Sequence, residues 1–186
     1  MSKRPLAVAV TGGIAAGKSE ALAAFARRGA ATLSADAVVH ELLASDPEVR
    51  DAIRERWGDA AVDDRSRIAE IVFHDRDELD WLERLLHPKT RAAADTWLRT
   101  VRAPVAVVEV PLLYETGGET RFDAVVVIAA SDDVRASRRE AIADREKRLL
   151  PEAEKIRRAD FSYVNDGSLD ELDAFVGGVL EALCTT

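Results

Sequence analysis

A glycine-rich segment near the start of the chain leaves few folds open. Residues 12–19 read Gly-Gly-Ile-Ala-Ala-Gly-Lys-Ser, which is the pattern Gly-x-x-x-x-Gly-Lys-Ser. A short apolar run at 6–10 precedes it and is typical of a strand covered on both faces. A helical pattern then extends from Gly17 to Arg28 and ends at Gly29. A strand, a glycine loop and a helix in this order predict a phosphate-binding loop beside a parallel sheet.

The residue types in this loop suit the binding of a nucleotide and a metal ion. Its glycines let the backbone direct N–H groups around a phosphate, and the following helix offers its positive end to the same anion. Lys18 is expected to reach the β- and γ-phosphates, and the Ser19 hydroxyl to bind Mg²⁺. The cofactors expected are therefore ATP and Mg²⁺. The predicted nucleotide-binding residues are Gly12, Gly13, Ile14, Ala15, Ala16, Gly17, Lys18, Ser19, Glu20 and Ala21.

Glu20 is an unusual residue directly after such a loop, because a carboxylate pointing inward would repel the phosphates. Asp and Glu are favoured in the first turn of a helix, since they complement the helix dipole. We therefore expect Glu20 to point into solvent.

The rest of the chain predicts an α/β fold. Further apolar runs indicate strands at 30–34, 105–110, 124–129 and 161–164. Because strands alternate with helical patterns, we expect a three-layer α/β/α arrangement with a parallel sheet and helices on both faces. Ser168 and Glu171 form a capping box, which predicts the start of a C-terminal amphipathic helix.

A long helical stretch lies between the second and third predicted strands. Helical patterns cover 37–44, 47–57, 67–73, 75–86 and 88–102. Pro47 and Pro88 suit the first turns of two of these helices, and Asp75 with Glu78 suits a helix N-terminus. The stretch is too long for a simple crossover. We therefore expect a single domain with an inserted helical region, 37–102, and a nucleotide-binding core formed by 1–36 and 103–186.

Composition excludes several classes of protein. The chain has 186 residues, a formal net charge of −8 and a single cysteine, Cys184. An acidic protein is not expected to bind nucleic acid in general, and one cysteine cannot form an internal disulfide. No Cys/His spacing resembles a zinc site. The apolar run at 6–10 is too short for a membrane span or a targeting segment, so a cytoplasmic protein is expected.

The phosphate loop alone does not distinguish a kinase from a GTPase or an ATPase. The Asp-x-x-Gly and Asn-Lys-x-Asp motifs of regulatory GTPases do not occur in the chain. The third strand carries Glu109 without the acidic neighbour that is usual in motor ATPases. A small-metabolite kinase needs only the loop, Mg²⁺, an acidic group near the acceptor hydroxyl and arginines for the transferring phosphoryl group.

Several further motifs give the chain a specific resemblance. They are Thr11 to Ser19, Ser34-Ala35-Asp36, His87-Pro88 with Arg91, Val110-Pro111-Leu112-Leu113-Tyr114-Glu115, Ala159-Asp160, and Asn165-Asp166-Gly167-Ser168. In this order and spacing they resemble the dephospho-CoA kinase family. The resemblance covers 8–168. It implies transfer of the ATP γ-phosphoryl group to the ribose 3′-hydroxyl of dephospho-CoA, the last step of coenzyme A synthesis.

The resemblance also implies residue roles. The catalytic residues would be Lys18, Asp36, Arg138 and Arg145. The acceptor would be bound by Asp36, His87, Arg91, Pro111, Leu112, Tyr114 and Glu115. Ser19 and Glu109 would serve the metal. Other interpretations remain open at this stage: Asp36 as the N-cap of a helix at 37–44, Glu109 as a structural carboxylate, His87 and Tyr114 as packing residues, and Arg91 as a surface ion-pair partner.

One region departs from the family pattern. The predicted lid, 135–152, is short, and its Arg-rich part contains neither Gly nor Gln, whereas related lids are longer. Arg138 and Arg145 align best with the family's arginines. Two other functions stay open: a nucleoside or nucleotide kinase, and a nucleotide-binding regulatory protein without transferase activity. ATP and dephospho-CoA are the expected partners, with no nucleic acid and no membrane.

Overall fold

The computed structural model describes residues 4–130 and 150–185. The chain divides into two compact units. One unit consists of Met1–Ser34 together with Leu98–Thr186 and contains the sheet, and the other is the helical unit Ala35–Trp97. Among the described helices, none combines the length and the apolar composition that crossing a membrane requires.

The first unit is built on a parallel sheet. Its strands are β1 Leu6–Gly12, β2 Ala31–Ser34, β3 Val105–Glu109, β4 Ala124–Ala130 and β5 Phe161–Asn165. They lie in the order β2-β3-β1-β4-β5, and every neighbouring pair is parallel. Strands β2 and β3 lie on one side of β1 in the sheet, and β4 and β5 lie on its other side. The loop after β1 therefore lies where the strand order reverses, which is where open α/β sheets bind ligands.

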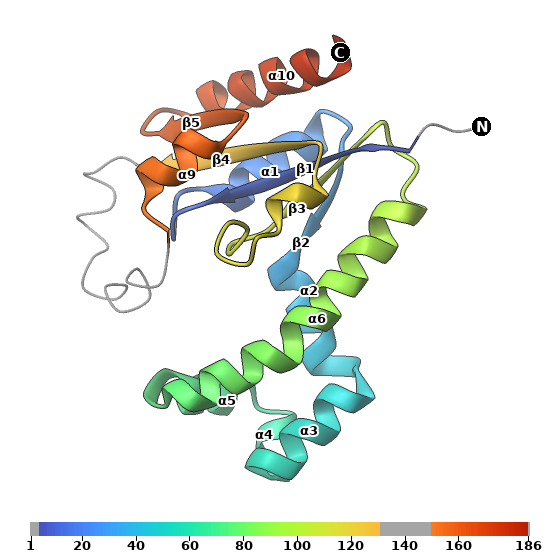
Figure 1. Cartoon of the computed structure of the whole chain (residues 1–186), viewed down its shortest axis with the longest axis vertical. Coiled ribbons are helices and arrows are strands. Elements are labelled where there is room, and N and C mark those ends of the chain that lie inside the picture. The colour runs from blue at the N-terminus through green and yellow to red at the C-terminus, as the bar shows by residue number, and fades with distance from the viewer. Residues whose placement is uncertain (1–3, 131–149, 186) are drawn as a thin grey trace. The chain divides into compact units, whose positions relative to one another are not determined.

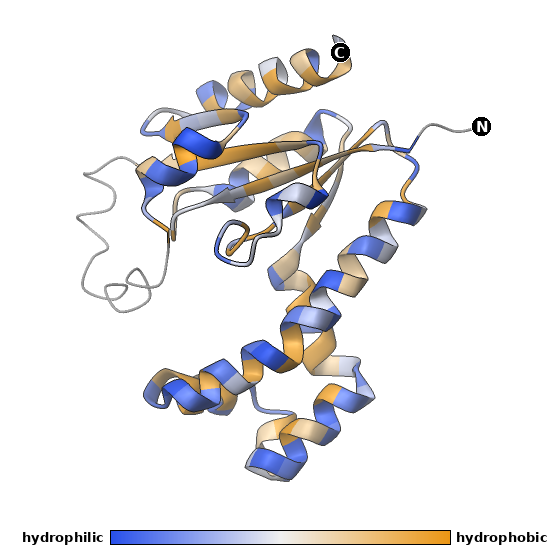
Figure 2. Ribbon diagram, in the orientation of Figure 1, coloured by the Kyte–Doolittle hydropathy of each residue, from blue (hydrophilic) through white to orange (hydrophobic). Residues whose placement is uncertain are grey.

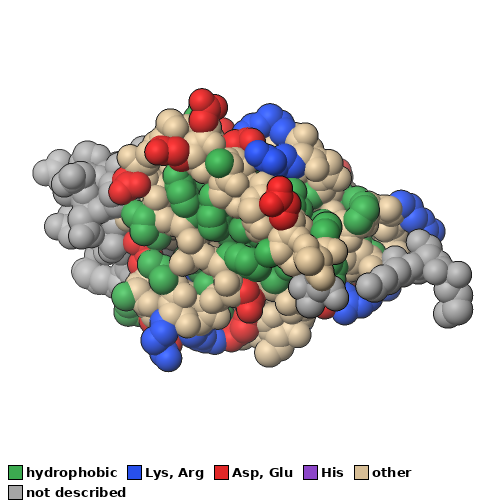
Figure 3. Space-filling view, turned by 90° about the horizontal axis from the view of Figure 1, so that it is seen from above, with side chains coloured by type: hydrophobic (Ala, Val, Ile, Leu, Met, Phe, Trp, Pro, Cys, Tyr) green, Lys and Arg blue, Asp and Glu red, His purple; other side chains and the backbone are tan. Residues whose placement is uncertain are grey.

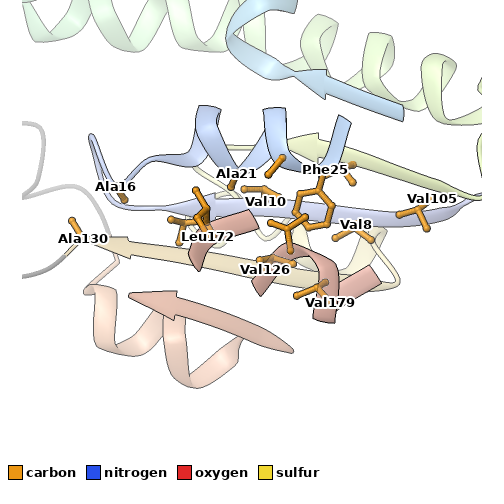
Figure 4. Packing of buried hydrophobic residues seen from close by; sticks show 14 residues of the cluster. Val8, Val10, Ala16, Ala21, Phe25, Val105, Val126, Ala130, Leu172 and Val179 are labelled. Atoms are coloured by element: carbon orange, nitrogen blue, oxygen red, sulfur yellow. The ribbon is translucent and has the colours of Figure 1, made fainter. Parts of the chain in front are cut away.

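Both faces of this sheet are covered, which confirms the predicted α/β fold. Helix α1, Lys18–Arg27, and helix α10, Leu169–Thr185, cover one face (Figure 1). Their core includes Phe25 and Leu172, packed against Val8 and Val10 of β1 (Figure 4). Helix α9, Glu152–Arg158, contributes to a smaller core on the other face.

Hydropathy explains these layers. The strand β4 is hydrophobic along its length, as expected for a strand buried on both faces, whereas α10 alternates between hydrophobic and hydrophilic residues (Figure 2). Seen from above, the visible surface has hydrophobic side chains gathered near its middle and acidic and basic side chains mostly toward its edges (Figure 3).

Helix α10 begins at the predicted capping box. The Ser168 backbone N–H donates to Glu171 Oε2 over 2.6 Å, and the Glu171 N–H donates to Ser168 Oγ over 3.3 Å.

The second unit is entirely helical in the structure. Its elements are α2 Ala35–Ser45, α3 Pro47–Trp57, α4 Asp59–Val62, α5 Arg65–His74 and most of α6 Arg76–Thr100. A separate apolar core joins them, with Val49 and Ile53 of α3 fully buried against Leu82 and Leu86 of α6. The unit therefore has its own hydrophobic centre.

Local caps explain where two of these helices begin. Asp46 accepts a hydrogen bond from the Val49 N–H over 3.0 Å, directly before Pro47, as expected for the start of α3. Asp75 accepts from the N–H groups of Asp77 and Glu78 at 2.9 and 3.2 Å, so the predicted start of α6 is confirmed.

One local prediction is wrong, and one of the alternatives left open by the sequence is excluded. The helices predicted at 75–86 and 88–102 are one helix, α6, with Pro88 in its interior rather than in a first turn. Proline removes one backbone hydrogen bond, but Leu82 and Leu86 bury against the helical core and hold the helix through that point. Asp36 does not cap a helix either, because α2 begins at Ala35 and Asp36 lies in its first turn.

Candidate nucleotide-binding and phosphoryl-transfer site

The loop after β1 needs glycine at its entrance. Gly12 has φ of 150°, and a Cβ atom there would lie 1.9 Å from the Ile128 carbonyl oxygen of β4. No side chain can occupy that space, because Gly12 pairs directly with Ile128 in the sheet. The first glycine of the motif thus lets two central strands approach where the phosphate loop begins.

The exit of the loop is equally restricted. Gly17 has φ of 94°, a left-handed conformation that favours glycine, and it directly precedes α1. A Cβ on Gly17 would lie 2.2 Å from the Asn165 side-chain nitrogen. Ala15 is also left-handed, with φ of 57°. Together these conformations produce the tight backbone turn that a phosphate loop requires.

Lys18 lies over this turn. Its Nζ donates a hydrogen bond to the Gly13 carbonyl oxygen over 2.7 Å, so the ammonium group lies within the loop rather than extending into solvent. Ser19 and Glu20 are exposed in the first turn of α1, whereas Ala16 and Ala21 are buried. The exposure of Glu20 agrees with the expectation that its carboxylate faces solvent.

Glu109 ends β3 at the carboxyl edge of the sheet. In the pairing register it lies between Val10 of β1 and Ser34 of β2, and it is 5% exposed. Within the described ranges no group of three His, Cys, Asp or Glu residues could hold a metal ion by itself. A Ser19 hydroxyl and a Glu109 carboxylate would supply the hard oxygen ligands that Mg²⁺ prefers, with the remaining positions left to water and phosphate.

The Pro-Leu-Leu-Tyr-Glu segment follows β3 and is held by hydrogen bonds to its backbone carbonyl groups. Thr11 Oγ1 donates to the Pro111 carbonyl oxygen over 3.3 Å, and the Gly118 N–H donates to the Leu113 carbonyl oxygen over 2.8 Å. Leu113 is fully buried in the core on the α9 face of the sheet. These contacts hold the segment close to the end of β1, from which the phosphate loop starts.

Tyr114 and Glu115 are engaged with α9. The Arg158 guanidinium carbon lies 4.4 Å from the Tyr114 ring centroid, and burial raises the pKa of the Tyr114 phenol. Glu115 Oε1 lies 2.7 Å from Lys155 Nζ and accepts a hydrogen bond from the Leu150 N–H over 2.9 Å. Lys155 is 1% exposed. In this unit, Glu115 therefore has a buried cation as its partner.

The remaining predicted acceptor residues belong to the helical unit. Asp36 is exposed in the first turn of α2. His87 is half-buried and Arg91 is exposed, and both lie on α6. Because α6 is continuous through Pro88, the four-residue spacing puts His87 and Arg91 on the same side of the helix. The predicted catalytic residues Arg138 and Arg145 lie outside the described residues, as does most of the predicted lid.

Sequence reasoning missed two residues that the fold brings to this region. Lys155 occurs in the run Glu152-Ala-Glu-Lys-Ile-Arg-Arg158, which is typical of a solvated helix face, and nothing local marks it as buried. In the sequence Asn165 is only the first residue of the Asn-Asp-Gly-Ser motif, yet its Nδ2 donates to the Ala16 carbonyl oxygen of the loop over 2.9 Å. Each contact joins residues that are distant in sequence.

Comparison with known proteins decides the family. The family model described as dephospho-CoA kinase matches residues 6–171. The chain belongs to the dephospho-CoA kinase family. A dephospho-CoA kinase of Rhodopseudomonas palustris strain HaA2 is 39% identical over 194 residues, covering 95% of each chain. A dephospho-CoA kinase of Chlorobaculum tepidum is 36% identical and covers 99% of this chain and 98% of its own length.

Solved structures share the fold over nearly the whole chain. The crystal structure of TT1252 from Thermus thermophilus has a TM-score of 0.79 and 32% identity, covering 97% of this chain and 99% of its own. A shikimate kinase from Aquifex aeolicus, with a TM-score of 0.55 and 13% identity, covers 97% of this chain and 99% of its own. At that identity the likeness shows only the fold, which is shared with other phosphate-loop kinases.

Proposed function

We propose that this member of the dephospho-CoA kinase family transfers the γ-phosphoryl group of ATP to the ribose 3′-hydroxyl of dephospho-CoA. The observation that carries the proposal is a complete phosphate loop, with Lys18 lying over it, in a chain that matches the family over residues 6–171. A kinase that acts in coenzyme A synthesis is expected in the cytoplasm, and a single cysteine suits a reducing compartment.

The donor side would be formed by the first unit. The backbone of residues 12–17 would surround the β-phosphate, and the N-terminus of α1 would point its partial positive charge at the same group. On ATP binding, Lys18 Nζ would exchange the Gly13 carbonyl for phosphate oxygens, which are stronger, charged acceptors. Residues 18–21 would complete the donor site.

Ser19 and Glu109 would hold Mg²⁺, with Glu109 acting directly or through a water molecule. When bound, Mg²⁺ would neutralise charge on the β- and γ-phosphates and orient them. The nearly complete burial of Glu109 would restrict its carboxylate to one position at the carboxyl edge of β3. A substitution there should change the Mg²⁺ dependence of turnover more than it changes the binding of the acceptor.

Acceptor roles are proposed for residues of each unit. Asp36 would accept or orient the proton of the attacking 3′-hydroxyl, and Arg91 would bind a phosphate group of dephospho-CoA, with His87 lining the same region. Pro111, Leu112, Tyr114 and Glu115 would form the part of the acceptor site that belongs to the first unit. Arg138 and Arg145 would stabilise charge on the transferring phosphoryl group.

The decisive assay follows ADP formation with Mg-ATP and a panel of acceptors. Turnover with dephospho-CoA, and not with nucleosides, nucleoside monophosphates or shikimate, is expected. Turnover only with nucleosides or their monophosphates would identify a nucleotide kinase instead. ATP binding without acceptor-dependent ADP formation would identify a regulatory protein that has no transferase activity.

Variants test the assigned roles. Asp36→Asn should lower kcat by about 10²- to 10⁴-fold, since it removes a general base, while leaving both KM values nearly unchanged. Asp77→Asn is a matched control, because Asp77 is also an exposed aspartate in the first turn of a helix. Lys18→Ala should weaken ATP binding and abolish turnover. Normal kcat in Asp36→Asn would remove Asp36 from the mechanism.

A further inference from the structure

Asn165 connects the last strand to the phosphate loop. It is the final residue of β5, it is half-buried, and its Nδ2 donates to the Ala16 carbonyl oxygen over 2.9 Å. The space beside it is closed, because a Cβ on Gly17 would lie 2.2 Å from the same nitrogen. The side chain of Asn165 therefore rests directly on the peptide that joins Ala16 to Gly17.

The orientation of this peptide has a consequence for phosphate binding. A trans peptide is planar, and its carbonyl and N–H groups point in opposite directions. Since the Ala16 carbonyl is directed at Asn165, the Gly17 N–H must point away from Asn165. In a phosphate loop, binding depends on successive backbone N–H groups directed together at the anion. The Asn165 amide thus selects one of the two directions available to the Gly17 N–H.

Asn165 is held firmly enough to perform this selection. It pairs with Ala130 at the end of the β4–β5 ladder. Two residues earlier, the Tyr163 ring stacks on Phe175 of α10 with centroids 5.0 Å apart. Three residues later, the Ser168 and Glu171 capping box starts α10. The amide therefore projects from a packed strand end between fixed elements, and it is not part of a free loop.

The opposite side of the loop is held differently. Lys18 Nζ donates to the Gly13 carbonyl oxygen over 2.7 Å. That bond must be given up if the ammonium group turns to phosphate oxygens, whereas the bond from Asn165 to Ala16 involves no group that the nucleotide needs. Of these two contacts, the bond from Asn165 can thus persist from the free to the bound state.

We propose that Asn165 is a positioning residue for ATP: it holds the Ala16–Gly17 peptide in the phosphate-binding orientation before the nucleotide arrives. A loop that is already oriented loses less conformational freedom on binding, so its affinity is higher. The inference rests on the proposed function, in which this loop binds ATP. The role differs from that of the loop residues, because Asn165 acts on the phosphate only through the backbone.

The test compares three variants with the wild-type chain. Asn165→Leu keeps the approximate shape of the side chain and removes the donor, and Asn165→Ala removes the side chain beyond Cβ. Val164→Ala is the control, since Val164 is the neighbouring residue on β5 and is 46% exposed. Mg-ATP dissociation constants are measured by calorimetry well below the apo unfolding midpoint of each variant, and KM values are measured for ATP and dephospho-CoA.

Loss of one hydrogen bond that orients a partly buried peptide should weaken Mg-ATP binding by roughly 5- to 30-fold in both Asn165 variants. The KM for ATP should rise in parallel, the KM for dephospho-CoA should change much less, and Val164→Ala should bind ATP as the wild type does. A purely structural role would lower the unfolding midpoint and leave the ATP dissociation constant of the folded protein unchanged.

The outcomes separate the two proposals. If the wild type does not bind Mg-ATP, the proposed function fails. If the wild type binds and either folded Asn165 variant binds equally well, the positioning role is wrong. Asn165→Ala provides a second test if the leucine side chain does not fit beside Gly17, because it introduces no new atoms.

Discussion

The Lys155 ammonium nitrogen lies 2.7 Å from a carboxylate oxygen of Glu115, and the two side chains are only 2% and 14% exposed. This buried pair joins α9 to the segment that follows β3. The same Glu115 oxygen accepts a hydrogen bond from the Leu150 N–H, whereas Glu115 Oε2 is buried without a hydrogen-bond partner in the described part of the chain. A buried charge of this kind is tolerated only while its partner remains.

Lys155→Met should therefore destabilise the protein by about 3–5 kcal/mol, because it leaves the Glu115 carboxylate buried without its cation. Urea denaturation measures the loss. The double variant Lys155→Met/Glu115→Gln should recover most of it, since glutamine keeps the shape and an acceptor for Leu150 while removing the charge. Equal losses in the single and the double variant would show that packing, and not the charge pair, is responsible.

Tyr114 should make stability sensitive to alkaline pH. Burial raises the pKa of its phenol above the ordinary value of about 10. The phenol of the unfolded chain then ionises at a lower pH than that of the folded chain. The stability that the buried neutral phenol contributes is therefore fully present below about pH 10 and is lost as the pH rises further. Thermal unfolding midpoints should fall less steeply above about pH 10 in Tyr114→Phe than in the wild type.

At neutral pH, Tyr114→Phe should lie within about 1 kcal/mol of the wild type, because the Tyr114 hydroxyl is buried and has no hydrogen-bond partner within the described ranges. Phenylalanine keeps the ring on which Arg158 stacks. A large loss at neutral pH would mean that the hydroxyl has an important interaction in solution.

Asp123 should contribute stability that is lost in acid. Its carboxylate accepts two hydrogen bonds of 2.7 Å from Arg4 and one of 2.8 Å from the Ala7 N–H, which lower its pKa. The contribution is present above the unfolded pKa of about 4 and disappears as the pH falls through the lower folded value.

Asp123→Asn should therefore cost about 1 kcal/mol at neutral pH, and the difference from the wild type should shrink below about pH 4. Urea denaturation at a series of pH values checks this. Asp63→Asn serves as a control, because Asp63 is 81% exposed in its ion pair with Arg50 and should contribute little. A difference that stays constant with pH would contradict the role of the Asp123 charge.

Replacing Pro88 by alanine should stabilise α6. Pro88 is exposed in the interior of a continuous helix, where proline costs roughly 3 kcal/mol relative to alanine in an isolated helix. We expect Pro88→Ala to raise the free energy of unfolding by about 1–3 kcal/mol, since it restores one backbone hydrogen bond. A loss of stability would show that the surrounding helical unit depends on a bend at this position.

The local sequence pattern is sufficient to predict those features of the fold that depend on neighbouring residues. The predicted ranges match all five described strands to within one or two residues. The signal is plainest for β1, β3 and β4, because a strand buried on both faces requires a continuous apolar sequence. The loop at 12–19 was evident from its glycines, and the start of α6 from Asp75. The sequence by itself also determined the family, since its motifs keep their order and spacing over most of the chain.

The tertiary structure decided what depends on distant partners. Pro88 predicts a helix boundary locally, but core packing on one side of α6 outweighs the missing hydrogen bond. Lys155 resembles any surface lysine until the fold buries it against Glu115. Asn165 is 149 residues from Ala16, and only the parallel arrangement of β1, β4 and β5 brings its amide to the phosphate loop. Such contacts follow from chain topology, which local periodicity does not encode.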